Sequence, residues 1–205
     1  MPTLFILFLI FLGVYTWKLK QVKSLSDNYI EQMMEKEQQA SAVRKKSIES
    51  LLLHIDISHL PIWDKEPILE KERTIWTQQQ KAIETAKLPM INLINQKNID
   101  LKLQYGPANF QHLIDYESNF IRFLQYIIMW GNSLYEANYI EEAIQVLEYG
   151  VNIGSDLSKN YILLADLYQT NHDIKKLTDL LEKASNYSSP SMKKTIEYIS
   201  ILLNP

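Results

Sequence analysis

The sequence predicts an all-α protein, and two observations lead to this fold class. The chain of 205 residues contains only five glycines, fewer than the frequent turns of a sandwich or barrel would need. Long stretches place apolar residues three and four positions apart, which is the spacing of one face of a helix. The hydrophobic content of 46% is sufficient for a packed core. We therefore expect helices packed into one body.

Composition and motifs exclude several classes of function. The net charge of −3 argues against a nucleic-acid binder, which normally displays a basic surface. The absence of cysteine excludes disulfides, thiolate catalysis and cysteine-based zinc sites. The sequence contains no glycine-rich phosphate loop and no G-x-S-x-G nucleophile motif. We expect no enzymatic activity, no cofactor and no metal.

Residues 1–17 carry no charged side chain and predict a single transmembrane anchor. As a helix they cover about 26 Å, and Trp17 with the following lysines can extend this toward a hydrocarbon core of ~30 Å. A secretory signal would instead place its positive residues before the apolar run. Here Lys18, Lys20 and Lys23 follow it, so the positive-inside rule predicts a cytoplasmic C-terminal body. In a bacterium, the membrane would be the plasma (inner) membrane.

Residues 18–60 are expected to form a helical stalk or linker next to the membrane. The helical pattern runs from Leu19 to about Ile55 without glycine or proline. Its apolar stripe is interrupted between Glu35 and Gln39, so we do not predict a strict heptad repeat. Two interpretations stay open: a short coiled coil, through which the chain could self-associate, and a solvated helix packed on the domain by one face.

A cluster of histidines and carboxylates follows in "HIDISHLPIWD", which contains His54, Asp56, His59 and Asp64. Imidazole and carboxylate groups are common zinc or iron ligands. The spacing matches no established metal motif, and the segment resembles a helix end before a proline. The sequence therefore does not predict a metal site here.

Residues 61–107 are expected to contain one helix and an irregular connector. Asp64 suits a helix cap, Pro67 suits the first turn, and the helical pattern stops before Pro89. The segment "NIDLKLQ" alternates apolar and polar residues like a short strand, but no second strand is available to pair with it. We therefore predict a connector. The apolar face of the helix consists of Ile68, Leu69, Ile75, Trp76 and Ile83.

The C-terminal half contains an internal repeat. The segment "YIIMWGNSLYEANYIEEAIQVLEYGVNIGSD" aligns with "NYILLADLYQTNHDIKKLTDLLEKASNYSSP". Two predicted helices fall in each copy. The aligned pairs, all separated by the same interval, are Gly131 with Ala165, Leu134 with Tyr168, Asn138 with His172, Ile140 with Ile174, Ala143 with Leu177, Leu147 with Leu181, and Gly150 with Ala184.

A period of about 34 residues with two helices per unit resembles the tetratricopeptide repeat family over about residues 124–190. The resemblance implies units at about 124–157 and 158–191 within a repeat domain of residues 108–205. It also implies a capping helix at 191–203. Residues 108–123 are expected to extend the first helix backwards, where it packs against the helix of residues 64–88.

The resemblance implies roles for seven packing residues and shows three departures from the family pattern. Small side chains let helices approach, and large ones fill the space between them. Asn138 and His172 stand where the family has a turn glycine, and Leu177 stands where it has a small residue. The packing positions are Gly131, Leu134, Ala143, Gly150, Ala165, Tyr168 and Ala184.

The family binds peptides or partner proteins on the concave face of its first helices. Carried over by position, this face comprises Gln125, Ile128, Asn132, Tyr135, Lys159, Ile162, Asp166 and Gln169. A carboxylate clamp is not expected, because Ile128 replaces the lysine that accompanies an asparagine at the position of Asn132. Residues 108–190 contain 5 basic and 11 acidic residues. This favours a basic or amphipathic ligand, unless the carboxylates only keep the helical surface soluble.

Two hypotheses of function follow. The first is a membrane-anchored adaptor or scaffold that binds a protein or peptide partner through the concave face. The second is a constitutive structural subunit of a membrane or envelope assembly, in which the anchor helix is itself an interface.

Overall fold

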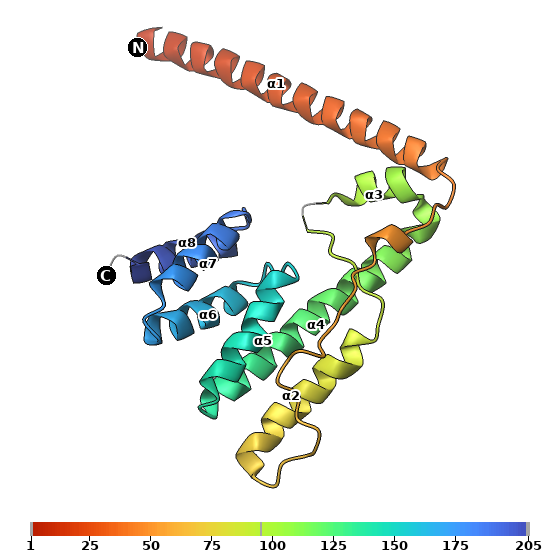
Figure 1. Ribbon diagram of the computed structural model, residues 1–205. Helices are drawn as coiled ribbons and strands as arrows, with labels where there is room; N and C mark the ends of the chain where they lie inside the picture. Colours follow the sequence, from red (N-terminus) through yellow and green to blue (C-terminus); the bar gives the residue numbers. More distant parts are fainter. Residues whose placement is uncertain (1, 95, 204–205) are drawn as a thin grey trace. The chain divides into compact units, whose positions relative to one another are not determined.

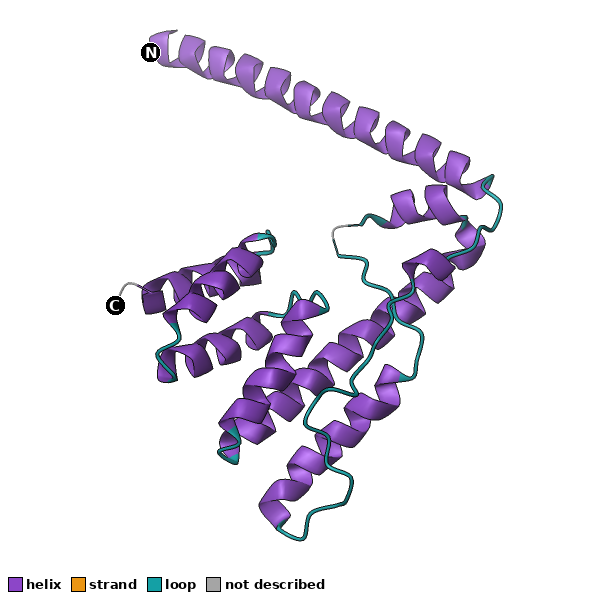
Figure 2. Ribbon diagram, in the orientation of Figure 1, coloured by secondary structure: helices purple, strands orange, loops and turns teal. Residues whose placement is uncertain are grey.

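The computed structural model describes residues 2–94 and 96–203, with side chains throughout except at residues 2–5, 24–26 and 71. Every regular element within these residues is a helix, which confirms the predicted all-α class (Figures 1 and 2). The chain divides into two compact units. One contains Met1–Ile48 and Gln96–Gln111, and the other contains Glu49–Asn95 and His112–Pro205.

The first unit consists of the long helix α1 (Pro2–Ser41), the short helix α3 (Asn98–Tyr105), the 3₁₀ turn η2 (Pro107–Asn109) and the residues that join them. Helix α3 packs against the C-terminal end of α1, where Ala40 is fully buried. Lys102 on α3 forms an ion pair of 2.9 Å with Glu37 on α1.

Helix α1 ends at Ser41, so the expected helical stalk of residues 18–60 is helical only in its first part, apart from the short 3₁₀ turn η1 (Glu49–Leu51). Beyond Ser41 the chain turns toward the end of α3, where Lys46 N–H donates to the Tyr105 carbonyl at 3.1 Å. Gly106, at φ 84°, lies so close to Arg44 that a Cβ there would be 2.7 Å from the Arg44 carbonyl oxygen. These long-range contacts end a helix that the local sequence alone would continue.

The segment expected as a connector, "NIDLKLQ", is helical in α3, so the prediction of irregular structure there was wrong. Alternation over seven residues does not distinguish a strand from a short buried helix. The helix buries Ile99 and Leu101, and a strand would also place these two residues on one face. Gly106 then follows the helix with a left-handed φ.

Within residues 2–94 and 96–203, no helix combines the length and the apolar content that crossing a membrane requires. The transmembrane anchor expected at residues 1–17 is therefore not supported. The side chains of residues 1–5 in that segment, and that of Leu25 in the stalk, lie outside the described residues.

The described part of the second unit is built from α2 (Glu70–Ala86), most of α4 (Phe110–Glu136), α5 (Ile140–Asn152), α6 (Ser158–Thr170), α7 (Ile174–Ser185) and α8 (Pro190–Leu203). Helix α6 packs against α5, α7 and α8, and α7 packs against α8. Helix α4 starts within the first unit, at Phe110 and Gln111, and the rest of it runs through the core of the second.

The helix ends follow the repeat that the sequence contains. Helices α5 and α7 begin at Ile140 and Ile174, two residues that the repeat aligns. Helices α4 and α6 end at Glu136 and Thr170, which are separated by the same interval. The two helix pairs α4–α5 and α6–α7 therefore turn at equivalent positions.

Helix α2 begins at Glu70, later than the expected start near Asp64. It contributes Ile75 and Ala82 to the core that α4, α5, α6 and α7 share. On its surface, the ammonium group of Lys81 lies 5.7 Å from the ring centroid of Tyr126 on α4. This packing of α2 beside α4 adds a further helix to the pair α4–α5 (Figure 1).

The strap, which we define as residues 52–69, crosses this core without regular structure. Gln79 on α2 is fully buried and holds the strap at Trp63. Its side-chain amide accepts from the Trp63 N–H and donates to the Trp63 carbonyl, both at 2.9 Å. The backbone N–H of Leu53 also donates to the Met90 carbonyl at 2.9 Å. These bonds satisfy backbone groups that a buried loop would otherwise leave without partners.

Two helix ends in the second unit require a left-handed residue that is not glycine. Asn138 (φ 69°) follows α4 and His172 (φ 54°) follows α6, at two positions that the internal repeat aligns. In both, the next residue's N–H donates to a carbonyl five residues back at 2.9 Å, as in a Schellman motif. Left-handed backbone is costly for residues with a Cβ, least so for asparagine.

We predict that His172→Gly increases the free energy of unfolding by about 0.5–1 kcal/mol, because glycine adopts this backbone without the Cβ penalty. The His172 side chain is exposed, so its removal leaves no cavity. Urea denaturation of the full chain measures the change. His172→Ala, which removes the same side chain but keeps the Cβ, should give no increase. Equal effects of glycine and alanine would contradict the prediction.

Candidate functional site

Three of the eight residues predicted for the concave face line one open pocket. Gln125 and Ile128 enter it from α4, and Lys159 enters it from the first turn of α6. The pocket has a volume of about 470 Å³. Its other lining residues come from α4, the α5–α6 loop, the first turn of α6, the α7–α8 loop and the start of α8: Met129, Asp156, Leu157, Ser158, Ser189 and Ser191. We call this space the α4 groove.

The floor of the α4 groove is apolar and its rim is polar. Ile128 is only 5% exposed and belongs to the floor, whereas Met129 is 48% exposed beside it. The Ser158 hydroxyl is buried without a hydrogen-bond partner among the described residues. At the α8 side, the Ser189 hydroxyl accepts from the Met192 N–H at 3.2 Å. An apolar floor with a few polar groups is the usual composition of a binding pocket.

The remaining predicted residues lie on α4 and α6 but do not line the groove. Asn132 donates to the Glu136 carboxylate one turn along its own helix, at 2.7 Å. Asp166 accepts a hydrogen bond from the Tyr198 hydroxyl of α8, and this bond raises the pKa of Tyr198 to about 12. Both polar groups therefore have partners within the chain. Tyr135 is 37% exposed, Ile162 is half-buried, and Gln169 has a buried carbonyl oxygen without a described partner.

Sequence reasoning missed a second hollow on the same helix, of about 220 Å³. It shares Asp156 with the α4 groove. Along α4, Glu117, Ile121, Leu124 and Ile128 recur at spacings of four, three and four, so they lie on one helix face. That spacing was visible in the sequence. The full lining is Asn92, Leu93, Ile94, Glu117, Phe120, Ile121, Leu124 and Asp156.

Two carboxylates, those of Glu117 and Asp156, line the second hollow, and Asp156 lies where it joins the first. Burial raises the pKa of Glu117, and the negative charge of Asp156 raises it further. A like charge nearby and a loss of solvent both disfavour the ionised form. Neither Glu117 nor Asp156 takes part in an ion pair with a described residue. The second hollow therefore holds two carboxylates beside apolar side chains.

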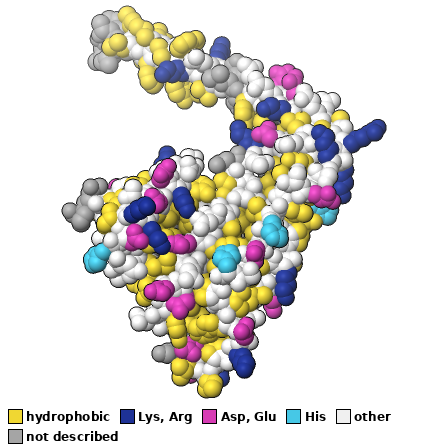
Figure 3. Space-filling view, in the orientation of Figure 1, with side chains coloured by type: hydrophobic (Ala, Val, Ile, Leu, Met, Phe, Trp, Pro, Cys, Tyr) yellow, Lys and Arg dark blue, Asp and Glu magenta, His cyan; other side chains and the backbone are white. Residues whose placement is uncertain are grey.

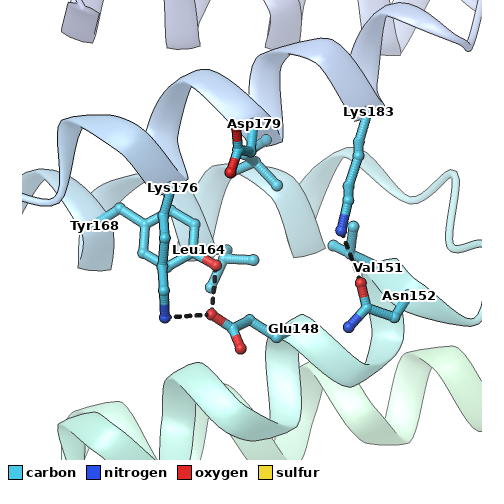
Figure 4. A pocket seen from close by; sticks show the side chains of 9 residues that line it. Glu148, Val151, Asn152, Leu164, Tyr168, Lys176, Asp179 and Lys183 are labelled. Carbon is cyan, nitrogen blue, oxygen red and sulfur yellow. Dashed lines mark hydrogen bonds and ion pairs between the residues drawn. The ribbon is translucent and has the colours of Figure 1, made fainter.

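A third pocket, of about 200 Å³, lies between α5, α6 and α7, and several of its lining side chains are hydrogen-bonded to one another (Figure 4). One carboxylate oxygen of Glu148 accepts from the Tyr168 hydroxyl at 2.7 Å and from the Lys176 ammonium at 2.9 Å. The Lys176 ammonium also lies 5.5 Å from the Tyr168 ring centroid. Nearby, Lys183 donates to the Asn152 side-chain carbonyl at 2.8 Å.

These bonds join three helices rather than present free groups to a ligand. Burial raises the pKa of Tyr168, and its hydrogen bond to Glu148 adds to the shift. The hydrogen bond to Glu148 likewise raises the pKa of Lys176. Tyr168 and Lys176 thus both favour the protonated state that keeps the contact. We assign this pocket to the packing of α5, α6 and α7.

The seven predicted packing residues are all buried between helices. A Cβ on Gly131 would lie 2.6 Å from Cγ of Leu147, so α4 and α5 touch where this glycine lies. A Cβ on Gly150 would lie 2.7 Å from the Asn160 amide nitrogen on α6. Leu177, which the internal repeat aligns with Ala143, is fully buried. The larger side chain is accommodated there within the core.

The histidine and carboxylate cluster of the strap forms local contacts. Asp56 accepts from the Ser58 N–H at 2.9 Å, and this bond, with smaller effects of His59 and His54, lowers the pKa of Asp56. The His59 ring lies 5.3 Å from the ring of Tyr149, edge to face. In the described part of the chain, no three His, Asp or Glu side chains are placed to hold a metal ion.

Comparison with known proteins does not identify a family. No family model matches the chain, and no curated protein or solved structure shows significant similarity to it. The geometry of the α4 groove is thus the basis for a functional proposal.

We predict opposite effects of Gly131→Ala in two backgrounds. In the natural chain, the new Cβ overlaps Leu147, and this overlap destabilises the fold more than the better helix preference of alanine stabilises it. The net result should be a free energy of unfolding lower by up to about 2 kcal/mol. In a Leu147→Ala chain the overlap is absent, so the same change should stabilise by up to about 1 kcal/mol. Urea denaturation of the four chains measures both effects.

Gly13→Ala is the matched control, because a Cβ at Gly13 meets no described atom within 4 Å. Gly131→Leu should abolish cooperative unfolding of the second unit, since its side chain cannot fit between α4 and α5. A destabilisation of the same size in both Leu147 backgrounds would show that the two residues do not limit the helix approach.

Proposed function

We propose that the second unit is an interaction module that binds a segment of a partner protein in the α4 groove. The observation that carries this proposal is an open, apolar hollow of about 470 Å³ whose walls come from three helices and two loops. Specific ligand pockets combine apolar walls with a few polar groups in this way. Gln125, Ile128 and Lys159, which the family resemblance marks as binding positions, lie in it.

Two features support the finer proposal that α4 to α7 are tetratricopeptide-like repeats. Helices α5 and α7 begin at Ile140 and Ile174, an interval of about 34 residues, which is the period of that family. The left-handed residues Asn138 and His172 are separated by the same interval. In such repeats the first helices of successive units form one face, so α4, α6 and the capping helix α8 would together provide the binding surface.

We further propose that residues 1–17 attach the chain to a membrane, with the second unit on the cytoplasmic side. The apolar side chains from Ile6 to Trp17 are between 38 and 63% exposed along α1, and Figure 3 shows hydrophobic side chains along the part of the helix near the N-terminus. An exposed apolar surface of this extent marks an interaction site or a membrane contact. Attachment would raise the effective concentration of a partner at the membrane.

The exposed surface of α1 also supports the second candidate, a structural subunit of a membrane or envelope assembly. Beyond residue 17, the apolar side chains of Val22, Tyr29, Ile30 and Met34 are also exposed. In this case α1 is an interface rather than a tether. Replacing residues 1–17 by an unrelated membrane anchor distinguishes the two, since an adaptor should keep its function and a structural subunit should lose it.

We predict that Met129→Lys removes partners from the α4 groove, because it places a charge and a long side chain in an apolar hollow. Partners are recovered by affinity purification of the full chain from detergent-solubilised cells and quantified by mass spectrometry. Ile201→Lys, at a 60% exposed position of α8 outside the groove, is the matched control. Equal recovery of every partner by Met129→Lys and the natural chain would contradict the assignment of the groove.

We predict that Ile10→Lys, in the middle of the apolar run, releases the chain from membranes. A charge there opposes burial in hydrocarbon by about 2.5–3.5 kcal/mol. The measurement is the fraction that sediments with membranes after alkaline carbonate extraction. Val22→Lys, at a similarly exposed apolar position after the run, should remain membrane-bound. Recovery of the natural chain in the supernatant would refute the anchor, and a C-terminal reporter active only after export would refute its orientation.

A further inference from the structure

The α4 groove continues past its apolar hollow along the same face of α4. The second hollow, lined by Glu117, Ile121 and Leu124, follows it toward the start of the helix. The two hollows share Asp156, which lies in the α5–α6 loop. A ligand longer than one side chain would therefore cross Asp156 as it passes from one hollow to the other.

The apolar side chains of this surface are not covered by the described part of the chain. Ile121 is 40% exposed in the second hollow, and Met129 is similarly exposed in the first. Leu157, Leu93 and Ile94 add apolar walls from the loops on either side. These side chains would exclude water from a bound segment and give it apolar contact on both sides of Asp156.

The charge at the junction is not neutralised by any described ion pair. Glu117 and Asp156 are close enough for the charge of Asp156 to raise the pKa of Glu117. Lys159 lines the first hollow, but it forms no ion pair with either carboxylate. Two carboxylates that line one hollow without a cation repel each other when both are ionised, and a cation placed between them would offset that repulsion.

We propose that the occupant of the α4 groove is an amphipathic protein segment whose lysine or arginine lies between Glu117 and Asp156. An apolar side chain of the same segment occupies the hollow beside Met129. Charge complementarity selects this occupant, since an acidic segment would bring a third negative charge to the junction. The inference rests on the proposed function and adds to it the chemistry of the partner.

The ligand segment is proposed to be amphipathic because of the order in which residues of α4 line the two hollows. Apolar positions at Ile121 and Ile128 lie on one helix face on either side of the junction with Asp156. A segment that reaches both hollows must present apolar side chains to Ile121 and to Met129 in addition to its basic residue. A uniformly basic segment would leave Ile121 and Met129 facing charged groups.

The test is a selection of random 16-residue peptides, displayed on phage, against the full chain in detergent micelles. Peptides that lose binding to the Met129→Lys chain are taken as groove ligands. We expect them to be enriched in lysine or arginine flanked by Leu, Ile, Met or Phe. Synthetic, fluorescently labelled copies of these peptides are then measured by anisotropy.

The deciding variant is Glu117→Gln with Asp156→Asn, which removes both charges and keeps the side-chain shapes. It should weaken the selected peptides about tenfold, as expected for two partly exposed ion pairs. The matched control is Glu141→Gln with Glu182→Gln, which removes two carboxylates of α5 and α7 that do not line the groove. This control should change affinity less than twofold, and circular dichroism checks that all variants fold.

The outcomes separate this inference from the proposed function. Groove ligands without basic residues, or basic ligands that bind the Glu117/Asp156 variant unchanged, would overturn the inference and leave the groove as a binding site. If no selected peptide is sensitive to Met129→Lys, the α4 groove is not a peptide site, and both proposals fail.

Discussion

The close approach of α4 and α5 is the constraint on which the second unit depends. At Gly131 no side chain separates α4 from Leu147 of α5, and at Gly150 none separates α5 from Asn160 of α6. Because packed interiors have little free volume, a methyl group at Gly131 would force Leu147 to shift, and one at Gly150 would force Asn160 to shift. The positions of α5 and α6 relative to α4 in turn determine where the α5–α6 loop carries Asp156. The acidic junction of the groove is therefore a product of two glycines that do not line it.

The polar groups of the second unit divide into two sets with different roles. Glu148, Tyr168 and Lys176 satisfy one another between α5, α6 and α7, and they stabilise the arrangement of those helices. Glu117 and Asp156 have no cationic partner among the described ion pairs, and they lie beside apolar side chains that are partly exposed. The first set has the properties of a structural network. The second set carries negative charge without a cationic partner, which is the property expected of a surface that binds a basic ligand.

The helices were predictable where long apolar periods and sequence-local signals determine them. The repeat interval placed Asn138 and His172 at turns, and both have the left-handed backbone that such turns need. The short helix α3 was missed because seven alternating residues fit a strand equally well. The end of α1 at Ser41 was missed because contacts with α3 and Gly106, far along the chain, determine it.

The groove was predictable only in part for the same reason. Gln125, Ile128 and Lys159 were found through their positions in the repeat, which is a local property. Asp156 and Met129 were missed, since one lies in a loop and the other on the flank of a helix face. That Glu117 approaches Asp156 depends on the packing of α4 with α5 and α6. The sequence around Glu117 and the sequence around Asp156 contain no pattern that predicts this proximity.

The strap has a consequence for the order in which the chain folds during synthesis. Its side chains contact residues that the ribosome adds much later. The ring centroids of Trp63 and Tyr139 are 5.5 Å apart, and those of His59 and Tyr149 are 5.3 Å apart. Helix pairs such as α6–α7 form from contacts that are near in sequence, which is the faster route. The strap is therefore made early, and although Gln79 and Met90 follow it soon, its packing on Tyr139 and Tyr149 is complete only after α5 has emerged.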